Sequence, residues 1–398
     1  MNCKKTNSTI LASLAYILAF ALGLFSTNLI ASSEVQKNKN IFVMLDGTDN
    51  TESSLTNVYK IFNQIPSDSN NIKIYIPGVG TTNNLAIGKL ASEALGKDME
   101  DKILKGYTFI NEHHNLGDKI YIFGFSRGAH EARSLAGLIS YAGILSHSAQ
   151  EKYKAGHENK ILELVKSKSD SDYLEKWTHW TPDSPPMLES EIYNTLGLKV
   201  SQAQIEFLGL WDTVPGSSFK KYGECKEKEG RRAGERYKSD SYPPIRNVFH
   251  AVAIDEKRSR FSPLLVCPAI NPTYTRVEEM WFPGAHSDVG GGYNDSGLPN
   301  ISLRWMLESL MEVYAFQSKP ELPEGDPLGL AHWSIGDVRG NTGSDCIDRS
   351  PGLNRSPAEK ARRDSGPARI MVSGNEVKLS YPLLCKSKYS KEPQPTTH

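Results

Sequence analysis

The chain has 398 residues, of which 38% are hydrophobic, so it can form one large α/β domain with insertions or two domains. Its 46 basic residues balance its 46 acidic residues, and the resulting net charge of zero provides no basic field for a nucleic acid. The sequence shows no internal repeat and none of the standard nucleic-acid-binding motifs. We therefore expect a globular protein without a nucleic-acid partner.

The N-terminus has the pattern of an export segment. Lys4 and Lys5 precede an apolar run from Ile10 to Ile30, and small residues near the end of that run suit cleavage. The run is also long enough to stay in a bilayer as an uncleaved anchor. We interpret residues 1–33 as a signal peptide or membrane anchor. The body of the protein is then expected to be exported, periplasmic or secreted, or anchored to the membrane by this segment.

Strands and helices alternate along the first part of the chain. Apolar runs rich in β-branched residues predict buried strands, and helical spacing of apolar residues predicts the helices between them. The strands are predicted over Ile41–Leu45, Asn71–Ile76 and Lys119–Phe123. The helices are predicted over Val58–Ile65, Ala129–Ile139 and Leu85–His113, the last with a break near Gly96. This alternation indicates a doubly wound, mostly parallel sheet.

Two charged insertions follow this alternating region. Residues 146–198 could form a lid over the carboxyl ends of the strands or a peripheral pair of helices. Residues 217–240 hold eight basic and five acidic side chains, which suits either a solvated loop or contact with anionic lipid head groups. Both insertions are expected to interrupt one α/β-hydrolase-like domain, to which we assign residues 34–385.

The remaining segments continue the α/β pattern. Strands are predicted over Gln204–Trp211 and Val277–Phe282, and helices over Ile245–Asp255 and Ile301–Phe316. A hairpin is predicted within Arg369–Leu384, turning at Ser373-Gly374-Asn375. Residues 386–398 have the composition of a disordered tail.

Four cysteines follow the export segment, an even number that suits an oxidising compartment. Their spacing matches no zinc motif. The sequence leaves open one disulfide, two disulfides in any of three pairings, or four free thiols. The four residues are Cys225, Cys267, Cys346 and Cys385.

A Gly-x-Ser-x-Gly motif, Gly124 to Gly128, joins the third strand to the helix after it. In a strand–turn–helix of this kind the serine is held in a strained conformation, with its hydroxyl clear of the sheet. Ser126 is therefore a candidate nucleophile, and the backbone N–H of Arg127 could stabilise an oxyanion. The alternative is a tight turn with a structural serine.

A serine becomes a nucleophile when a histidine removes its proton, and a carboxylate orients that histidine. Asp212 follows the fourth strand and His286 follows the fifth, so both belong with Ser126 at the carboxyl edge of a parallel sheet. The order Ser, Asp, His is that of α/β-hydrolases. We predict Ser126 as the nucleophile, His286 as the base and Asp212 as the acid.

Other side chains compete for these roles. Asp255 and Asp288 are alternative acids, although Asp288 suits the structuring of the glycine-rich turn after it. The N–H of Gly47, which follows the first strand, could complete the oxyanion hole or belong to a capped turn. A metal site at Asp46, Asp288 and His286 has no recognised ligand spacing, so we predict no metal. Four further histidines lie within helical patterns, where solvated or core roles are expected: His113, His114, His130 and His250.

Six sequence blocks contain or surround these residues: Leu45–Thr48, Pro77–Thr81, Gly124–Ala129, Leu210–Val214, Ala253–Arg258 and Trp281–Tyr293. In this order they resemble the α/β-hydrolase domain of type VI secretion phospholipase effectors and their many uncharacterised relatives, over roughly residues 41–315. The resemblance implies a serine lipase or phospholipase A acting on glycerophospholipid esters, with Ser126, Asp212 and His286 as its triad. Such effectors usually lack a signal segment, so an exported relative could serve envelope lipid metabolism or hydrolyse another ester.

The sequence therefore predicts a serine hydrolase that cleaves carboxylic esters, phospholipids in particular, outside the cytoplasm. We expect a lipid or ester substrate, contact with a membrane surface and no cofactor, and the oligomeric state stays open. Two other classes of function remain: a catalytically inactive hydrolase fold that binds at the membrane, and a peptidase or acyl transferase that uses the same triad.

Overall fold

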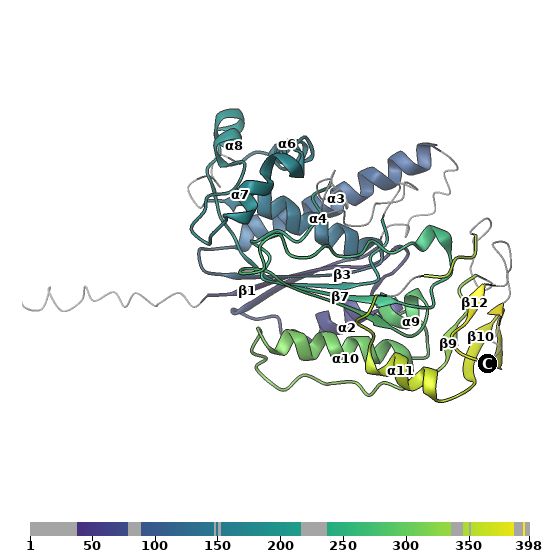
Figure 1. The fold of residues 1–398 in the computed structure, drawn as a ribbon. Coiled ribbons are helices and arrows are strands. Elements are labelled where there is room, and N and C mark those ends of the chain that lie inside the picture. Colours follow the sequence, from purple (N-terminus) through teal and green to yellow (C-terminus); the bar gives the residue numbers. More distant parts are fainter. Residues whose placement is uncertain are drawn as a thin grey trace, which may run out of the picture. The chain divides into compact units, whose positions relative to one another are not determined.

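Six parallel strands pair side by side in the central sheet (Figure 1). The structure, a computed structural model, describes residues 38–78, 89–146, 149, 153–215, 237–335, 345–349, 352–385 and 393–394. In spatial order the strands are β2 (Asn71–Ile76), β1 (Asn40–Leu45), β3 (Lys119–Phe125), β6 (Ile205–Trp211), β7 (Asn247–Ala253) and β8 (Arg276–Phe282). The chain moves from β1 to one edge and then through β3 to the other, which is a doubly wound arrangement. The predicted α/β-hydrolase-like fold with a mostly parallel sheet is confirmed.

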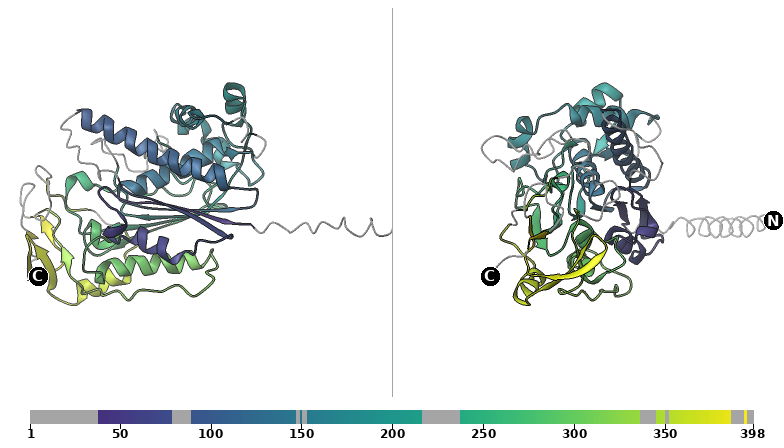
Figure 2. Two further views of the ribbon diagram at one scale, coloured as in Figure 1. Left: turned by 180° about the vertical axis from the view of Figure 1, so that it is seen from behind. Right: turned by 90° about the vertical axis from the view of Figure 1, so that its right-hand side faces the viewer.

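Helices cover both faces of this sheet (Figures 1 and 2). One face carries α3 (Lys89–His113) and α4 (Arg127–Ala142), and the other carries α2 (Asn57–Gln64) and α10 (Gly297–Met311). Successive residues of β1 point to opposite faces, so Val43 joins the core under α3 and α4 while Met44 joins the core under α2 and α10. Burial on both faces explains why the strands read as unbroken apolar runs.

Two helix predictions were wrong. The segment Ile245–Asp255 contains the strand β7, although its apolar residues recur at the spacing of a helix face. β7 lies between β6 and β8 and is buried on both faces, so the alternation that marks a half-exposed strand is absent. The sheet therefore has six strands where five were predicted. The other difference is smaller: α3 continues through Gly96 without the predicted break.

The insertion of residues 146–198 packs against the far end of α4 (Figure 1). It contains α6 (His157–Lys166), the 3-10 helix η2 (Asp170–Tyr173), α7 (Leu174–Thr178) and α8 (Glu189–Leu196). The ring of Trp177 meets that of Tyr141, in the last turn of α4, with centroids 5.2 Å apart. Thr178 O accepts a 3.0 Å hydrogen bond from Asn271, which precedes the amino end of β8. These contacts lie at the amino ends of the strands, so of the two arrangements that the sequence left open, a lid and a peripheral pair of helices, the contacts agree with the peripheral one.

A small second sheet stands near α9 (His286–Gly290), at the carboxyl end of the main sheet (Figure 1). Its strands pair in the order β11 (Asn375–Leu379), β10 (Ala368–Val372) and β9 (Ala331–His332), and α11 (Pro357–Asp364) precedes β10. β10 and β11 form the predicted hairpin, which turns at Ser373 and Gly374. His332 donates its backbone N–H to Asp288 of α9 at 2.8 Å, so this sheet is tied to the edge where catalytic loops are expected.

Several sequence predictions concern residues that the structure does not describe. The export segment of residues 1–33 is one, and the basic loop is described only from residue 237 onward. Of the predicted tail, residues 393–394 form β13 (Pro393–Gln394), which pairs with β12 (Leu384–Cys385), and the other residues are not described. Among the helices of the described ranges, none combines the length and apolar character that a membrane span requires.

A disulfide joins Cys346 to Cys385. It closes a stretch of 39 residues that contains α11 and the hairpin. Cys267 is disulfide-bonded as well. Of the pairings that the sequence left open, those that contain Cys346–Cys385 agree with the structure.

Replacing both Cys346 and Cys385 with serine should lower the free energy of unfolding by about 4 kcal/mol, because the unfolded chain regains the entropy that a closed loop of 39 residues removes. Urea unfolding followed by tryptophan fluorescence measures the change. Wild-type protein treated with a strong reductant serves as the control and should shift in the same direction. An unchanged midpoint with an unchanged slope in the double variant would contradict a stabilising role.

Candidate active site

Ser126 occupies a strained turn between β3 and α4. Its backbone has φ +60° and ψ −124°, a left-handed conformation that a residue with a Cβ adopts at a cost. The Ser126 N–H donates to Trp211 O at 2.9 Å, and Ser126 O accepts from the Val214 N–H at 3.2 Å. The turn is thus fastened to the loop that follows β6, on both sides of Asp212.

Two glycines allow the end of β1 to approach this turn. A Cβ on Gly128 would lie 2.3 Å from Leu45 O, which no side chain can tolerate. A Cβ on Gly47 would lie 2.9 Å from the Cβ of Ser126. The first turn of α4 therefore rests directly on the end of β1, and Gly47 stands beside the candidate nucleophile.

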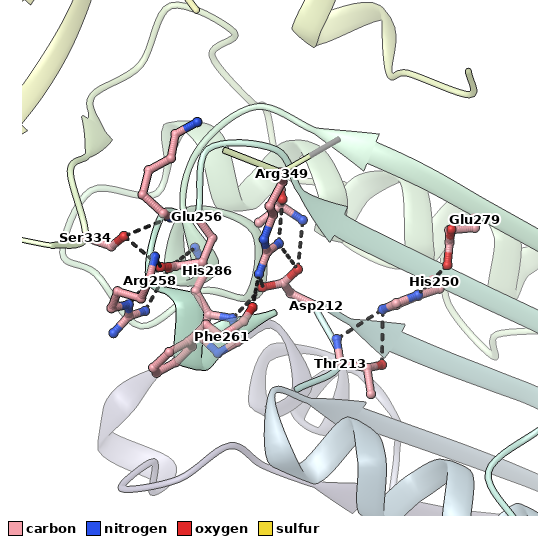
Figure 3. Close-up of polar contacts among 12 residues, drawn as sticks. Asp212, Thr213, His250, Glu256, Arg258, Phe261, Glu279, His286, Ser334 and Arg349 are labelled. Carbon is pink, nitrogen blue, oxygen red and sulfur yellow. Dashed lines mark hydrogen bonds and ion pairs between the residues drawn. The ribbon is translucent and has the colours of Figure 1, made fainter. Parts of the chain in front are cut away.

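His286 and Asp212 form a buried hydrogen-bonded pair (Figure 3). The imidazole Nδ1 lies 2.6 Å from Asp212 Oδ2, and Asp212 is fully buried while His286 is 5% exposed. The imidazole is held between two rings, with centroids 4.6 Å away at Phe125 and 5.0 Å away at Phe261. Asp212 also has a positive φ, +36°, which a residue with a Cβ rarely adopts.

The three predicted catalytic residues therefore stand at the carboxyl edge of the sheet, with His286 at the start of α9. The acid–base bond is present, and Phe125, the neighbour of Ser126, packs on the imidazole. Among the described residues, no hydrogen bond joins the Ser126 hydroxyl to His286. In hydrolases without substrate this bond is often long and tightens when substrate binds.

Glu256 is a buried carboxylate that holds the backbone of His286 (Figure 3). It accepts the His286 backbone N–H at 3.3 Å, two side-chain bonds from Arg258 at 2.8 Å each, and the Ser334 hydroxyl at 2.8 Å. Burial by itself would raise the pKa of Glu256, but the charge and hydrogen bonds of Arg258 outweigh it and lower the pKa to about 2. The block Ala253–Arg258 thus supports the base.

The alternative acids are engaged elsewhere. Asp255 accepts the Gly284 N–H at 2.7 Å and the Tyr381 hydroxyl at 3.2 Å. Asp288 accepts the Ala285 N–H at 2.9 Å and lies 2.7 Å from His332 Nδ1, so it holds the first turn of α9. Neither carboxylate contacts the imidazole of His286.

Asp46 belongs to a capped turn. Its carboxylate accepts the Gly47 N–H at 2.7 Å, the Thr56 hydroxyl at 2.5 Å and the Tyr75 hydroxyl at 2.6 Å. The Gly47 N–H, which we predicted as an oxyanion donor, is therefore already engaged. The Arg127 N–H, at the first position of α4, has no hydrogen-bond acceptor among the described residues.

His250, which we expected in a helix, lies in the buried strand β7. Its Nε2 accepts the Thr213 N–H at 3.1 Å, and its Nδ1 lies 2.9 Å from Glu279, so it fixes the residue after Asp212 (Figure 3). His130 lies in α4 as predicted. Within the described ranges, no three His, Cys, Asp or Glu side chains are grouped closely enough to hold a metal ion.

Arg349 is the residue of this site that the sequence did not reveal. Its guanidinium Nη1 lies 2.6 Å from Asp212 Oδ1, and Nη2 lies 3.1 Å from Asp212 Oδ2 (Figure 3). Burial would raise the pKa of the Asp212 carboxyl, but the charge of Arg349 and the bond to His286 hold it well below its usual range. A lone arginine in a turn-rich segment carries no motif, and no sequence signal connects it to Asp212.

Comparison with known proteins identifies the domain. Residues 39–309, more than half of the chain, match the family described as "T6SS, Phospholipase effector Tle1-like, catalytic domain". The chain belongs to this family. Membership in a phospholipase family indicates a hydrolase, and the Tle1-like region contains Ser126, Asp212 and His286 but ends before Arg349.

Three similar proteins are each matched over only part of their length. An uncharacterized protein of Saccharomyces cerevisiae, YEL023C, is 27% identical over an alignment of 262 residues, which covers 60% of this chain and 34% of that protein. The crystal structure of an uncharacterized protein from Pseudomonas aeruginosa is 18% identical, with a TM-score of 0.39, over 80% of this chain and 50% of that one. The Tle1 effector bound to the VgrG spike from the type 6 secretion system is 22% identical, with a TM-score of 0.33, over 65% of this chain and 52% of that one. The chain thus spans about a third of the yeast protein and about half of each of these two solved structures.

The lowered pKa of Glu256 predicts how stability depends on pH. Because the folded-state pKa lies below the ordinary value of 4.5, the contribution of Glu256 is complete above about pH 5 and is lost as the pH falls toward 2, by about 3 kcal/mol in total. A Glu256→Gln variant should be less stable at neutral pH, since Arg258 loses its partner. Its free energy of unfolding should nevertheless fall less steeply on acidification than that of the wild type.

Urea unfolding at a series of pH values compares the two slopes. Glu376→Gln is the matched control, because Glu376 pairs with Arg369 on the exposed surface and should leave the slope nearly unchanged. Parallel pH curves for wild type and Glu256→Gln would contradict the charge assignment of Glu256.

Proposed function

We propose that the protein is a serine hydrolase that cleaves carboxylic ester bonds, most of all those of phospholipids. One observation carries the proposal: a buried His286–Asp212 pair with a 2.6 Å hydrogen bond stands beside a strained Gly-x-Ser-x-Gly turn at the carboxyl edge of the sheet. This is the arrangement of groups that nucleophilic ester cleavage requires. Membership in the Tle1-like phospholipase family supports the same chemistry.

The proposed reaction proceeds through an acyl-enzyme. The Ser126 hydroxyl attacks the ester carbonyl carbon while His286 Nε2 takes its proton, and the Arg127 N–H donates to the oxyanion that forms. The carbon–oxygen bond to the leaving alcohol then breaks, and the proton on His286 passes to that alcohol. A water molecule repeats the sequence, again losing its proton to His286, which returns the proton to Ser126 and releases the carboxylic acid. Asp212 accepts from Nδ1 throughout and stabilises the imidazolium.

The substrate class and the location of the protein are further parts of the proposal. The family suggests a phospholipid ester as substrate and a membrane surface as the place of action. The chain covers only part of its relatives, so the activities of those whole proteins are not transferred to it. Export is supported by the export pattern of residues 1–33 and by the disulfide between Cys346 and Cys385, since disulfides persist in oxidising compartments.

Ser126→Ala and His286→Ala should each lower the rate of ester hydrolysis by about 10⁴-fold or more, and the double variant should lose little further, because the two residues act as one unit. The rate is measured with short acyl esters and with phospholipid vesicles, and the released fatty acid is identified by mass spectrometry. Ser134→Ala is the matched control. Ser134 is a buried serine of α4, the helix that follows Ser126, and its hydroxyl donates to His130 O.

Turnover by Ser126→Ala equal to that of the wild type would overturn the proposal. A fluorophosphonate probe separates the rival functions. It should label wild type and Ser134→Ala but not Ser126→Ala, whereas an inactive binding module would remain unlabelled in every form. Hydrolysis of short esters without hydrolysis of phospholipid would retain the serine mechanism and reject the lipid substrate.

A further inference from the structure

The guanidinium of Arg349 and the carboxylate of Asp212 form a two-pronged ion pair. Besides Asp212, Nη1 donates to Ala253 O at 2.5 Å, and Nη2 donates to Phe261 O (Figure 3). The side chain of Arg349 is 2% exposed and that of Asp212 is fully buried, so water screens this pair very little. A bidentate pair fixes the plane of the carboxylate as well as its position.

The contacts of Asp212 leave its carboxylate one orientation. Oδ2 accepts from His286 Nδ1 and from Arg349 Nη2, while Oδ1 accepts from Arg349 Nη1 and from the Ala253 N–H at 3.0 Å. Rotation of the carboxylate would break the bonds to Arg349 and misplace the acceptor for the imidazole. Without Arg349, Ala253 and His286 would hold Asp212 through one bond each, and the carboxylate would be a buried charge without its cation.

The segment that carries Arg349 is fixed to the loop after β7. Ser259 N donates to Asp345 O and Ile347 N donates to Lys257 O, each at 2.9 Å, so the two segments pair like antiparallel strands. Lys257 Nζ lies 2.8 Å from Asp348, and the disulfide of Cys346 ties the same segment to Cys385. These constraints fix the four residues that precede Arg349.

The segment of Arg349 also lies beyond residues 39–309, the part of the chain that matches the Tle1-like family. The ion-pair partner of Asp212 therefore comes from outside the region that matches the family. A second arginine, Arg258, pairs with Glu256, which accepts the backbone N–H of His286. Two acids and two arginines thus surround His286, and their formal charges cancel.

We propose that Arg349 is a positioning residue for the catalytic base: it orients the Asp212 carboxylate so that Oδ2 faces His286 Nδ1. The proposal rests on the proposed serine mechanism for its effect on rate. Its structural content, the orientation of Asp212 toward His286, can be measured without any turnover.

Arg349→Ala should lower kcat by about 100-fold with little change in KM, because a small misplacement of a catalytic group costs about that factor while the substrate contacts are untouched. The kcat of Arg349→Lys should lie between those of the wild type and Arg349→Ala, since lysine retains the charge but not the bidentate geometry. Added guanidinium ion at non-denaturing concentration should restore part of the activity of Arg349→Ala and none of that of Asp212→Asn. A loss of folding alone would not produce this rescue.

Arg362→Ala is the matched control. Arg362 is also a fully buried arginine of the C-terminal region, and it donates to the carbonyl oxygens of Pro327, Gly329 and Arg369. It makes no contact with Asp212. Its replacement should lower the melting temperature as Arg349→Ala does, yet leave kcat per folded molecule, counted by fluorophosphonate labelling, close to that of the wild type.

A proton spectrum provides the readout that is independent of catalysis. The Nδ1–H of a histidine bonded to a buried carboxylate resonates far downfield, and its assignment is made with His286→Ala, which should lack it. The signal should persist in Ser126→Ala and Arg362→Ala and should shift or disappear in Arg349→Ala.

The outcomes separate the two proposals. Unchanged kcat and an unchanged downfield signal in Arg349→Ala would overturn the positioning role while leaving the serine mechanism intact. If Ser126→Ala retains full activity, the serine mechanism fails, and the downfield signal alone still decides whether Arg349 orients Asp212. Loss of activity in Arg349→Ala with no guanidinium rescue and an unchanged signal would also reject the positioning role.

Discussion

A buried carboxylate that stays ionised is the constraint on which the site depends. Asp212 is fully enclosed, and burial alone would favour its protonated, uncharged form. A protonated Asp212 could not accept the Nδ1–H of His286 as a carboxylate does, and the imidazole would lose the partner that sets its tautomer. The cation of Arg349 and the bond to His286 keep the Asp212 carboxylate charged, so the position of the imidazole is set by a fixed hydrogen-bond acceptor.

The sheet brings Ser126, Asp212 and His286 together, and hydrogen bonds between the loops hold them there. The carboxyl ends of β3, β6 and β8 lie along one edge, which is why residues far apart in sequence share the site. The Ser126 turn is bonded to the residues on either side of Asp212, and His250 braces the loop at Thr213. Buried ion pairs rarely add much net stability, because their desolvation costs nearly as much as their attraction returns. Removing one partner is nevertheless costly, because it leaves the other charge buried and unpaired, so the four charges hold the geometry around His286 in place.

The sequence predicted what local patterns and parallel topology determine. The strands around the elbow, the turn itself and the positions of Asp212 and His286 follow from apolar runs and from where such runs end. β7 was mistaken for a helix because a strand buried on both faces has no alternation, and its apolar residues happened to fall at helical spacing. Gly47 was predicted as an oxyanion donor, but the neighbouring Asp46 carboxylate captures its N–H, a side-chain competition that residue patterns do not show.

Arg349 shows a different limit of sequence reasoning. Its bond to Asp212 spans 137 positions, and neither its spacing nor its neighbours distinguish it from other arginines of the turn-rich region. A pair of this kind becomes visible only when the fold has placed the segment of residues 345–349 beside the loop after β7. The insertion of residues 146–198 is similar, because its composition suits a lid as well as a peripheral layer, and only its contacts with the last turn of α4 and the residues before β8 separate the two.

The position of Arg349 along the chain has a consequence for biosynthesis. Translation completes β1 to β8, the elbow and both members of the His286–Asp212 pair well before the ribosome reaches residue 349. The segment that supplies the counter-charge of Asp212 is therefore synthesised after every other residue of the site, and its disulfide closes only when Cys385 has also been made and oxidised.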